Sequence, residues 1–190
     1  MGCRQRGHGI EMTAHIHITG ASGSGVTTLG AALAARLGAP QFDVDDFYWM
    51  PTVPPFTDKR PVAERLALLG DRLLGDKWVL SGSLVGWGDP LMPRFDLIVF
   101  LYTPADVRIS RLRAREADRY GAAIEPGGVM HENSRAFLEW ADRYDEPHFE
   151  GRSLAMHNRW LAAQSAPVLR LDGVSTTAEQ VAGVIERLGT

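Results

Sequence analysis

A glycine-rich segment that joins an alternating apolar run to a helical run has the spacing of a phosphate-binding loop. Gly20 and Gly25 are separated by four residues, and Thr27 follows two positions later. This matches G-x-x-x-x-G-K-[ST], in which glycines let the backbone wrap round phosphate oxygens and the hydroxyl meets Mg²⁺. The segment predicted to bind phosphate comprises Gly20, Ala21, Ser22, Gly23, Ser24, Gly25, Val26, Thr27 and Thr28.

Position 26 departs from this pattern, because valine stands where the motif has lysine. The backbone N–H groups and the N-terminus of the following helix still supply positive potential without any side chain. A plain Gly/Ser turn is the alternative, but three glycines between a strand and a helix favour phosphate binding. We therefore expect the loop to bind phosphate, and we expect the charge of the absent lysine to come from elsewhere in the chain.

Arginines recur at helical spacing in the second half of the chain and are candidates for that charge. Arg108, Arg111, Arg115 and Arg119 fall on one face of the predicted helix, while Ile109 and Leu112 can face the core. A guanidinium group meets phosphate oxygens in pairs. We favour Arg111 and Arg115 as catalytic residues, with Arg152 second. The alternative is a solvated face partly neutralised by Glu116 and Asp118.

Carboxylates gather where the second predicted strand meets its loop, in the sequence Asp43-Val44-Asp45-Asp46. In a strand Asp43 and Asp45 would point to the same side. A carboxylate beside an acceptor hydroxyl suits phosphoryl transfer, in which positioning dominates. For Asp46 a solvated turn is equally consistent. No carboxylate stands in Ser81-Gly82-Ser83 at the end of the third strand, and Asp96 begins the fourth strand, at the opposite end of the sheet.

Aromatic residues follow the second and third predicted strands, and they define a candidate acceptor region. Tyr48, Trp49, Phe56 and Trp87 could stack on a ring of the acceptor or pack beneath a proline-rich loop. Lys59 and Arg60 could contact an anionic acceptor or solvate that loop. The pattern leaves both pairs of alternatives open.

Strands and helices alternate along the chain, which predicts an α/β fold with a five-stranded, mainly parallel sheet covered by helices on both faces. Ligands of such sheets bind at the carboxyl ends of the strands. The expected strands span residues 14–19, 41–44, 78–81, 95–101 and 168–171. The expected helices span 27–37, 61–74, 104–119, 131–144 and 152–163, and a last helix starts at the capping box of Thr176 and Glu179.

The 190 residues are expected to form one domain, in which residues 1–11 are a flexible leader, 45–75 the acceptor-side region and 119–165 a helical lid. Trp140, Tyr144 and Trp160 would pack inside that lid. With a net charge of −3 and one cysteine, the chain offers no sign of a nucleic-acid partner or a disulfide framework. No apolar run has the length of a membrane helix, and the single cysteine leads us to expect a reducing, cytoplasmic setting. The sequence pattern does not indicate an oligomeric state.

The chain resembles the P-loop kinases of small metabolites, the nucleoside monophosphate kinase, shikimate kinase and gluconate kinase group. The resemblance rests on GASGSGVTT, FDVDDFYW, WVLSGS, FDLIVFLY with its arginine-rich helix, and VLRLDG. It implies a three-layer P-loop NTPase fold, a mobile lid, and ATP or another nucleoside triphosphate with Mg²⁺ as cofactors. It also implies that Thr27 and Asp43 serve the metal, whereas Asp45 orients a small-molecule acceptor or acts as its base.

The expected function is transfer of the γ-phosphoryl group to a small metabolite or nucleoside monophosphate. Val26 and the lack of a carboxylate after the third strand motivate an alternative, a nucleotide-binding degenerate kinase or sensor that transfers no phosphate. A third hypothesis, an ATPase that drives a partner, has less support because no acidic residue in the pattern is placed to position water.

Overall fold

A computed structural model describes residues 13–189; the predicted leader, residues 1–11, lies outside the described residues. The five strands form one sheet in the order β2-β3-β1-β4-β5, and every neighbouring pair is parallel. The carboxyl ends of all five strands therefore meet at one edge. The strands are β1 (Ala14–Gly20), β2 (Gln41–Asp43), β3 (Lys77–Ser81), β4 (Leu97–Tyr102) and β5 (Val168–Asp172).

Seven α-helices accompany the strands within the described residues. They are α1 (Val26–Leu37), α2 (Val44–Tyr48), α3 (Val62–Arg72), α4 (Ala105–Tyr120), α5 (His131–Asp142), α6 (Leu154–Ala162) and α7 (Thr177–Leu188). Short 3-10 helices span Asp89–Arg94, Gly121–Ile124 and Arg143–Asp145. This order confirms the predicted alternation, and α7 begins at the predicted capping box of Thr176 and Glu179.

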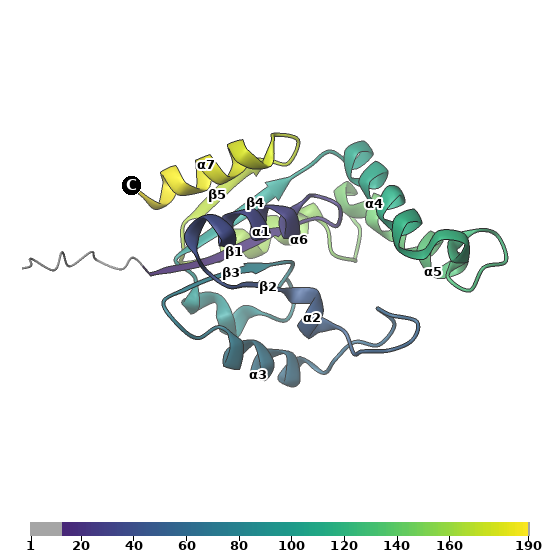
Figure 1. Ribbon diagram of the computed structural model, residues 1–190, viewed down its shortest axis with the longest axis horizontal. Helices are drawn as coiled ribbons and strands as arrows, with labels where there is room; N and C mark the ends of the chain where they lie inside the picture. The colour runs from purple at the N-terminus through teal and green to yellow at the C-terminus, as the bar shows by residue number, and fades with distance from the viewer. Residues whose placement is uncertain (1–12, 190) are drawn as a thin grey trace, which may run out of the picture.

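The sheet is the middle of three layers, as Figure 1 shows. On one face, Leu29 and Leu33 of α1 and Val184 of α7 pack with β1 and β4. On the other face, Leu69 of α3 and Trp160 of α6 pack with β3 and β4. Such two-sided burial explains why β4 is an almost unbroken apolar run. The fold class predicted from the alternation of elements is confirmed.

Helices α4 and α5 extend beyond the carboxyl edge of the sheet, where they form a helical arm together with the 3-10 helices that flank α5 (Figure 1). The arm has a small core of its own, in which Ile109, Leu112 and Ala141 are buried against Phe137. The prediction that Trp160 packs in this subdomain is wrong: it is buried against the sheet, because α6 belongs to the layer that includes α3. Tyr144 is buried, as predicted.

No helix in the part of the chain that the structure describes has both the length and the apolar character needed to cross a bilayer.

Candidate functional site

The glycine-rich loop lies between β1 and α1, at the centre of the sheet and at its carboxyl edge. Gly23 and Gly25 have φ angles of 80° and 99°, which side chains with a Cβ rarely adopt. A Cβ on Gly20 would lie 2.5 Å from the carbonyl oxygen of Leu101 and 2.6 Å from Oγ of Ser24. These glycines therefore permit a tight turn that ends at the N-terminus of α1, the arrangement that suits a phosphate.

Val26 is the first residue of α1, and its side chain packs partly buried against the core beneath α1 and α7. It offers no polar group to a phosphate. The next residue, Thr27, is exposed, and its Oγ1 donates a 2.9 Å hydrogen bond to Oδ2 of Asp43. The hydroxyl of Thr27 is thus paired with the carboxylate of Asp43, whereas an apolar valine occupies the position of the motif lysine.

Asp43 and Asp45 do not share the face of a strand, so that prediction is wrong. Strand β2 ends at Asp43, and Asp45 lies in the first turn of the short helix α2. Asp43 is the N-cap of this helix, because its Oδ1 accepts a 3.0 Å hydrogen bond from the backbone N–H of Asp45. Capping therefore orients Asp43 so that one carboxylate oxygen holds α2 and the other meets Thr27.

Asp45 keeps access to solvent, yet the surrounding protein atoms desolvate its carboxylate and raise its pKa above the ordinary value. The charge of Asp43 raises the pKa further. Arg152, a hydrogen bond from Trp49 and Arg115 act in the opposite direction. A carboxylate with a raised pKa and two nearby cations is suited to accept a proton.

Arg152 reaches the glycine-rich loop from the segment just before α6. Its Nη2 donates a 2.6 Å hydrogen bond to Oγ of Ser22, and its guanidinium lies 5.1 Å from the ring centroid of Trp140. Its Nε is buried without a hydrogen-bond partner within the described residues. Burial lowers the pKa of Arg152, and the charge of Asp45 counteracts this effect. A buried guanidinium with an unpaired Nε–H beside the glycine-rich loop is able to donate to an anion.

Arg111 also lies against the glycine-rich loop. Its Nη1 donates to the carbonyl oxygen of Ser24 at 3.4 Å, and its Nη2 donates to that of Gly173 at 3.1 Å. Arg115 lies one turn further along α4, with its guanidinium 5.6 Å from the ring centroid of Phe137. Desolvation lowers the pKa of Arg115, Arg119 lowers it further, and the charge of Asp45 raises it.

The four arginines that the sequence pattern placed on one face of α4 do not form one row along the glycine-rich loop. Arg108 is fully buried in the arm, where its guanidinium donates to the carbonyl oxygens of Thr103 and Ala141 and to Oδ2 of Asp145 at 2.8 Å. Arg119 lies over Phe56, 5.0 Å from the ring centroid. Arg108 therefore holds the arm together, and these contacts occupy its guanidinium away from the loop.

The predicted acceptor aromatics do cluster. Tyr48 lies 4.8 Å from Trp49 and 6.0 Å from Trp87, and Trp49 lies 6.1 Å from Phe56, measured between ring centroids. Sequence reasoning missed Arg65 of α3, which is buried with its guanidinium 3.9 Å from the centroid of Tyr48. Its helical spacing among leucines concealed it.

The two basic residues of the acceptor-side loop are held by the backbone around them. Arg60 donates through Nε to the carbonyl oxygen of Phe47 at 3.1 Å and through Nη2 to that of Trp49 at 3.4 Å. Lys59 forms an antiparallel bridge with Trp49. These contacts fix the loop that follows α2, so Arg60 has a structural role here.

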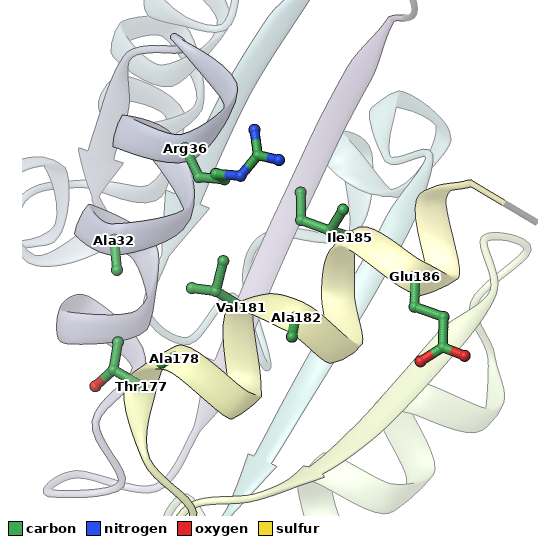
Figure 2. A pocket seen from close by; sticks show the side chains of 8 residues that line it. All are labelled: Ala32, Arg36, Thr177, Ala178, Val181, Ala182, Ile185 and Glu186. Atoms are coloured by element: carbon green, nitrogen blue, oxygen red, sulfur yellow. The ribbon is translucent and has the colours of Figure 1, made fainter.

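A shallow hollow lies elsewhere, on the outer face between α1 and α7 (Figure 2). Small and apolar side chains, among them Ala32, Val181 and Ile185, line it, and Arg36 and Glu186 flank it. None of the residues predicted to bind phosphate or metal lines this hollow. We therefore place the candidate site at the carboxyl edge, where Ser22, Asp43, Asp45 and Arg152 converge.

Solved structures with a similar fold include kinases of small metabolites. A shikimate kinase from Acinetobacter baumannii in complex with shikimate superposes with a TM-score of 0.55 at 14% identity, covering 94% of each chain. A shikimate kinase from Bacteroides thetaiotaomicron gives 0.54 at 18%, covering 93% of this chain and 99% of that one. A gluconokinase from Sinorhizobium meliloti 1021 gives 0.53 at 22%, covering 94% and 93%. The chain has the fold of the P-loop small-molecule kinases.

The chain also has a close sequence relative, which places it in a family. No family model matches the chain. The uncharacterized protein YqaC of Bacillus subtilis (strain 168) is 46% identical over 180 residues, which span 94% of this chain and 99% of YqaC. The chain belongs to the family of YqaC.

Proposed function

We propose that this protein is a phosphotransferase that moves the γ-phosphoryl group of ATP to a hydroxyl group of a small molecule. The observation that carries the proposal is the position of Arg152. It is hydrogen-bonded to Ser22 of the phosphate loop and interacts electrostatically with Asp45. One cation between the loop and a carboxylate suits a reaction whose charge develops between donor and acceptor.

The residues present fit a magnesium ion that accompanies the nucleotide. Within residues 13–189 no three His, Cys, Asp or Glu side chains cluster as a metal cage. Mg²⁺ in kinases does not need one, because phosphate oxygens and water fill most of its coordination sphere. Thr27 and Asp43, joined at 2.9 Å, would supply the hydroxyl and the carboxylate. The ion would neutralise charge on the phosphate oxygens.

Each charged side chain then has a distinct role. Arg152 replaces the motif lysine and binds the phosphates, with Arg111 and Arg115 supporting it from α4. Asp45 orients the acceptor hydroxyl and takes its proton as the oxygen bonds to the γ-phosphorus. The bond between that phosphorus and the bridging oxygen breaks, and ADP leaves. The raised pKa of Asp45 favours proton acceptance near neutral pH.

A pair of matched variants tests this proposal. Asp45→Asn and Asp46→Asn change neighbouring carboxylates of the same helix. We expect Asp45→Asn to lower kcat at least about 10²-fold, the usual contribution of a general base, while Asp46→Asn retains most activity. Phosphate transfer from radiolabelled ATP to a panel of hydroxyl acceptors measures both. Equal activity of the Asp45 variant and the wild type would contradict the assigned role.

A second function has its own support, namely nucleotide binding without transfer. It rests on Val26, which packs against apolar side chains at the position where the motif has a lysine. This second function is favoured if Mg-ATP raises the melting temperature of the wild-type protein but the protein phosphorylates no acceptor in the panel.

A further inference from the structure

Four polar side chains from separate segments meet beneath the phosphate loop. Nε2 of His157 in α6 lies 3.3 Å from Oγ1 of Thr19 and 3.2 Å from Oγ of Ser83. Its Nδ1 lies 2.8 Å from the hydroxyl of Tyr144. Thr19 directly precedes the first glycine of the loop, Ser83 follows β3, and Tyr144 belongs to the arm. All four side chains are buried.

The His157 ring is neutral in this setting. Burial, together with the nearby positive charge of Arg152, lowers the pKa of His157 to about 3. A neutral imidazole has one donor and one acceptor nitrogen, and each hydroxyl around it can both donate and accept. Nδ1 therefore bonds to Tyr144, while the single N–H or lone pair of Nε2 is shared between Thr19 and Ser83. The cluster satisfies its buried polar groups, which is the condition for such a network to specify one arrangement of its segments.

A short path connects this cluster to Arg152. Arg152 directly precedes Ser153, the N-cap of α6, whose Oγ accepts a hydrogen bond from the backbone N–H of Met156. The backbone N–H of His157 donates to the carbonyl oxygen of Ser153 at 2.9 Å. His157 thus ties the first turn of α6 to β1 and to the end of β3, and this turn sets the place from which the Arg152 side chain extends to Ser22.

We propose that His157 is a positioning residue that, through its Nε2 contacts with Thr19 and Ser83, keeps Arg152 at the phosphate loop. The proposal rests on the proposed function, because it gives Arg152 a phosphate to bind. It predicts that nucleotide affinity depends on a side chain that does not itself touch the nucleotide. It also predicts that the Nε2 side of the ring matters more than the mere filling of the volume.

Two amide variants separate position from packing. Glutamine reaches about as far as Nε2, whereas asparagine reaches about as far as Nδ1. We expect His157→Asn to weaken Mg-ATP binding about tenfold, corresponding to about 1.4 kcal/mol, and His157→Gln to retain most of the affinity. In an Arg152→Ala background, His157→Asn should cause no further loss, because the two residues act on one interaction. Isothermal titration calorimetry measures each affinity.

Ser83→Ala provides a milder variant, which removes one hydroxyl and is expected to weaken binding in the same direction by a smaller factor. Circular dichroism establishes that each variant is folded. Wild-type affinity in a folded His157→Asn protein would overturn the proposal, and so would losses that add fully to those of Arg152→Ala.

A readout without nucleotide distinguishes failure of this proposal from failure of the proposed function. The Nε–H of Arg152 gives a side-chain signal in ¹H–¹⁵N NMR spectra that can be assigned by its loss in Arg152→Lys. We expect this signal to shift or broaden in His157→Asn and to persist in His157→Gln. If the wild-type protein does not bind Mg-ATP, the proposed function fails, while these spectra still test the positioning. An unchanged signal in His157→Asn would contradict the positioning itself.

Discussion

Nη2 of Arg152 donates a 2.6 Å hydrogen bond to Oγ of Ser22, although 130 residues separate the two in the sequence. The contact places a cation at the glycine-rich loop, where Val26 stands at the position of the motif lysine. We expect Arg152→Ala to lower kcat/KM by about 10²- to 10³-fold, as the loss of one transition-state contact does. Steady-state kinetics measure the change. Arg113→Ala, at an exposed arginine of α4, is the control and should have little effect.

Restoring the motif lysine provides a test of replacement. If Arg152 supplies the charge that the loop lacks, Val26→Lys should recover part of the ATP affinity lost in Arg152→Ala, since a lysine there would reach the phosphates. Titration calorimetry of the double variant checks this. A double variant that binds no better than Arg152→Ala would argue against the replacement.

The acid limb of the pH–rate profile should report Asp45. A proton acceptor works only when ionised, so activity is expected to fall as pH falls through the raised pKa of Asp45. Arg152→Gln removes a charge that lowers this pKa, so the limb should move to higher pH. The measurement is kcat/KM from about pH 4 to about pH 9, a window that begins near the ordinary carboxyl pKa. If the acid limb of Arg152→Gln stays at the wild-type pH, the charge of Arg152 does not influence the pKa of Asp45.

Arg108 should matter for stability rather than for binding. Its guanidinium is fully buried and bonds to Thr103, Ala141 and Asp145. Removing this guanidinium would leave two buried carbonyl oxygens and a partly exposed carboxylate without their partner, at about 1–3 kcal/mol for each buried unsatisfied group, so Arg108→Met should lower the urea midpoint strongly. Arg135→Ala breaks exposed ion pairs with Glu132 and Glu139 and should barely change that midpoint. Similar midpoints for both variants would contradict this difference.

Two buried histidines should make the protein less stable in mild acid. Burial lowers the pKa of His17 to about 4 and that of His157 to about 3. Below about pH 6.5 the unfolded chain binds protons on both residues while the folded chain does not. The free energy of unfolding therefore keeps its full value above that pH and should decline by up to about 2.7 kcal/mol per pH unit towards pH 4. Urea unfolding at several pH values measures the slope, and His157→Gln should reduce it.

Local signals are sufficient to predict the fold and the tight glycine-rich turn between β1 and α1. The glycine spacing from Gly20 to Gly25 and the capping box of Thr176 and Glu179 are written in adjacent residues, so their geometry follows from short-range rules. Helix α2 escapes prediction because its five residues carry no helical periodicity beyond the Asp43 cap. That omission produces the error about the faces of Asp43 and Asp45.

The positions of the arginines could not be predicted from the sequence. Arg108 and Arg111 lie three residues apart on one helix, and no local signal indicates that Arg108 is buried while Arg111 lies at the loop. Arg108 bonds to Asp145, 37 residues away, and Arg111 bonds to Gly173, 62 residues away. The sequence pattern ranks Arg152 below Arg111 and Arg115 as a candidate for the same reason. Its contact with Ser22 depends on how the arm and α6 pack against the end of β1.

The long span between Ser22 and Arg152 also bears on how the protein is made. Synthesis proceeds from the N-terminus, so the glycine loop leaves the ribosome long before the arginine that faces it. A nascent chain that ends before residue 152 carries the loop and the Thr27–Asp43 pair but lacks this cation. Nucleotide binding should therefore strengthen late in translation, when the segment at residues 152–157 completes the site.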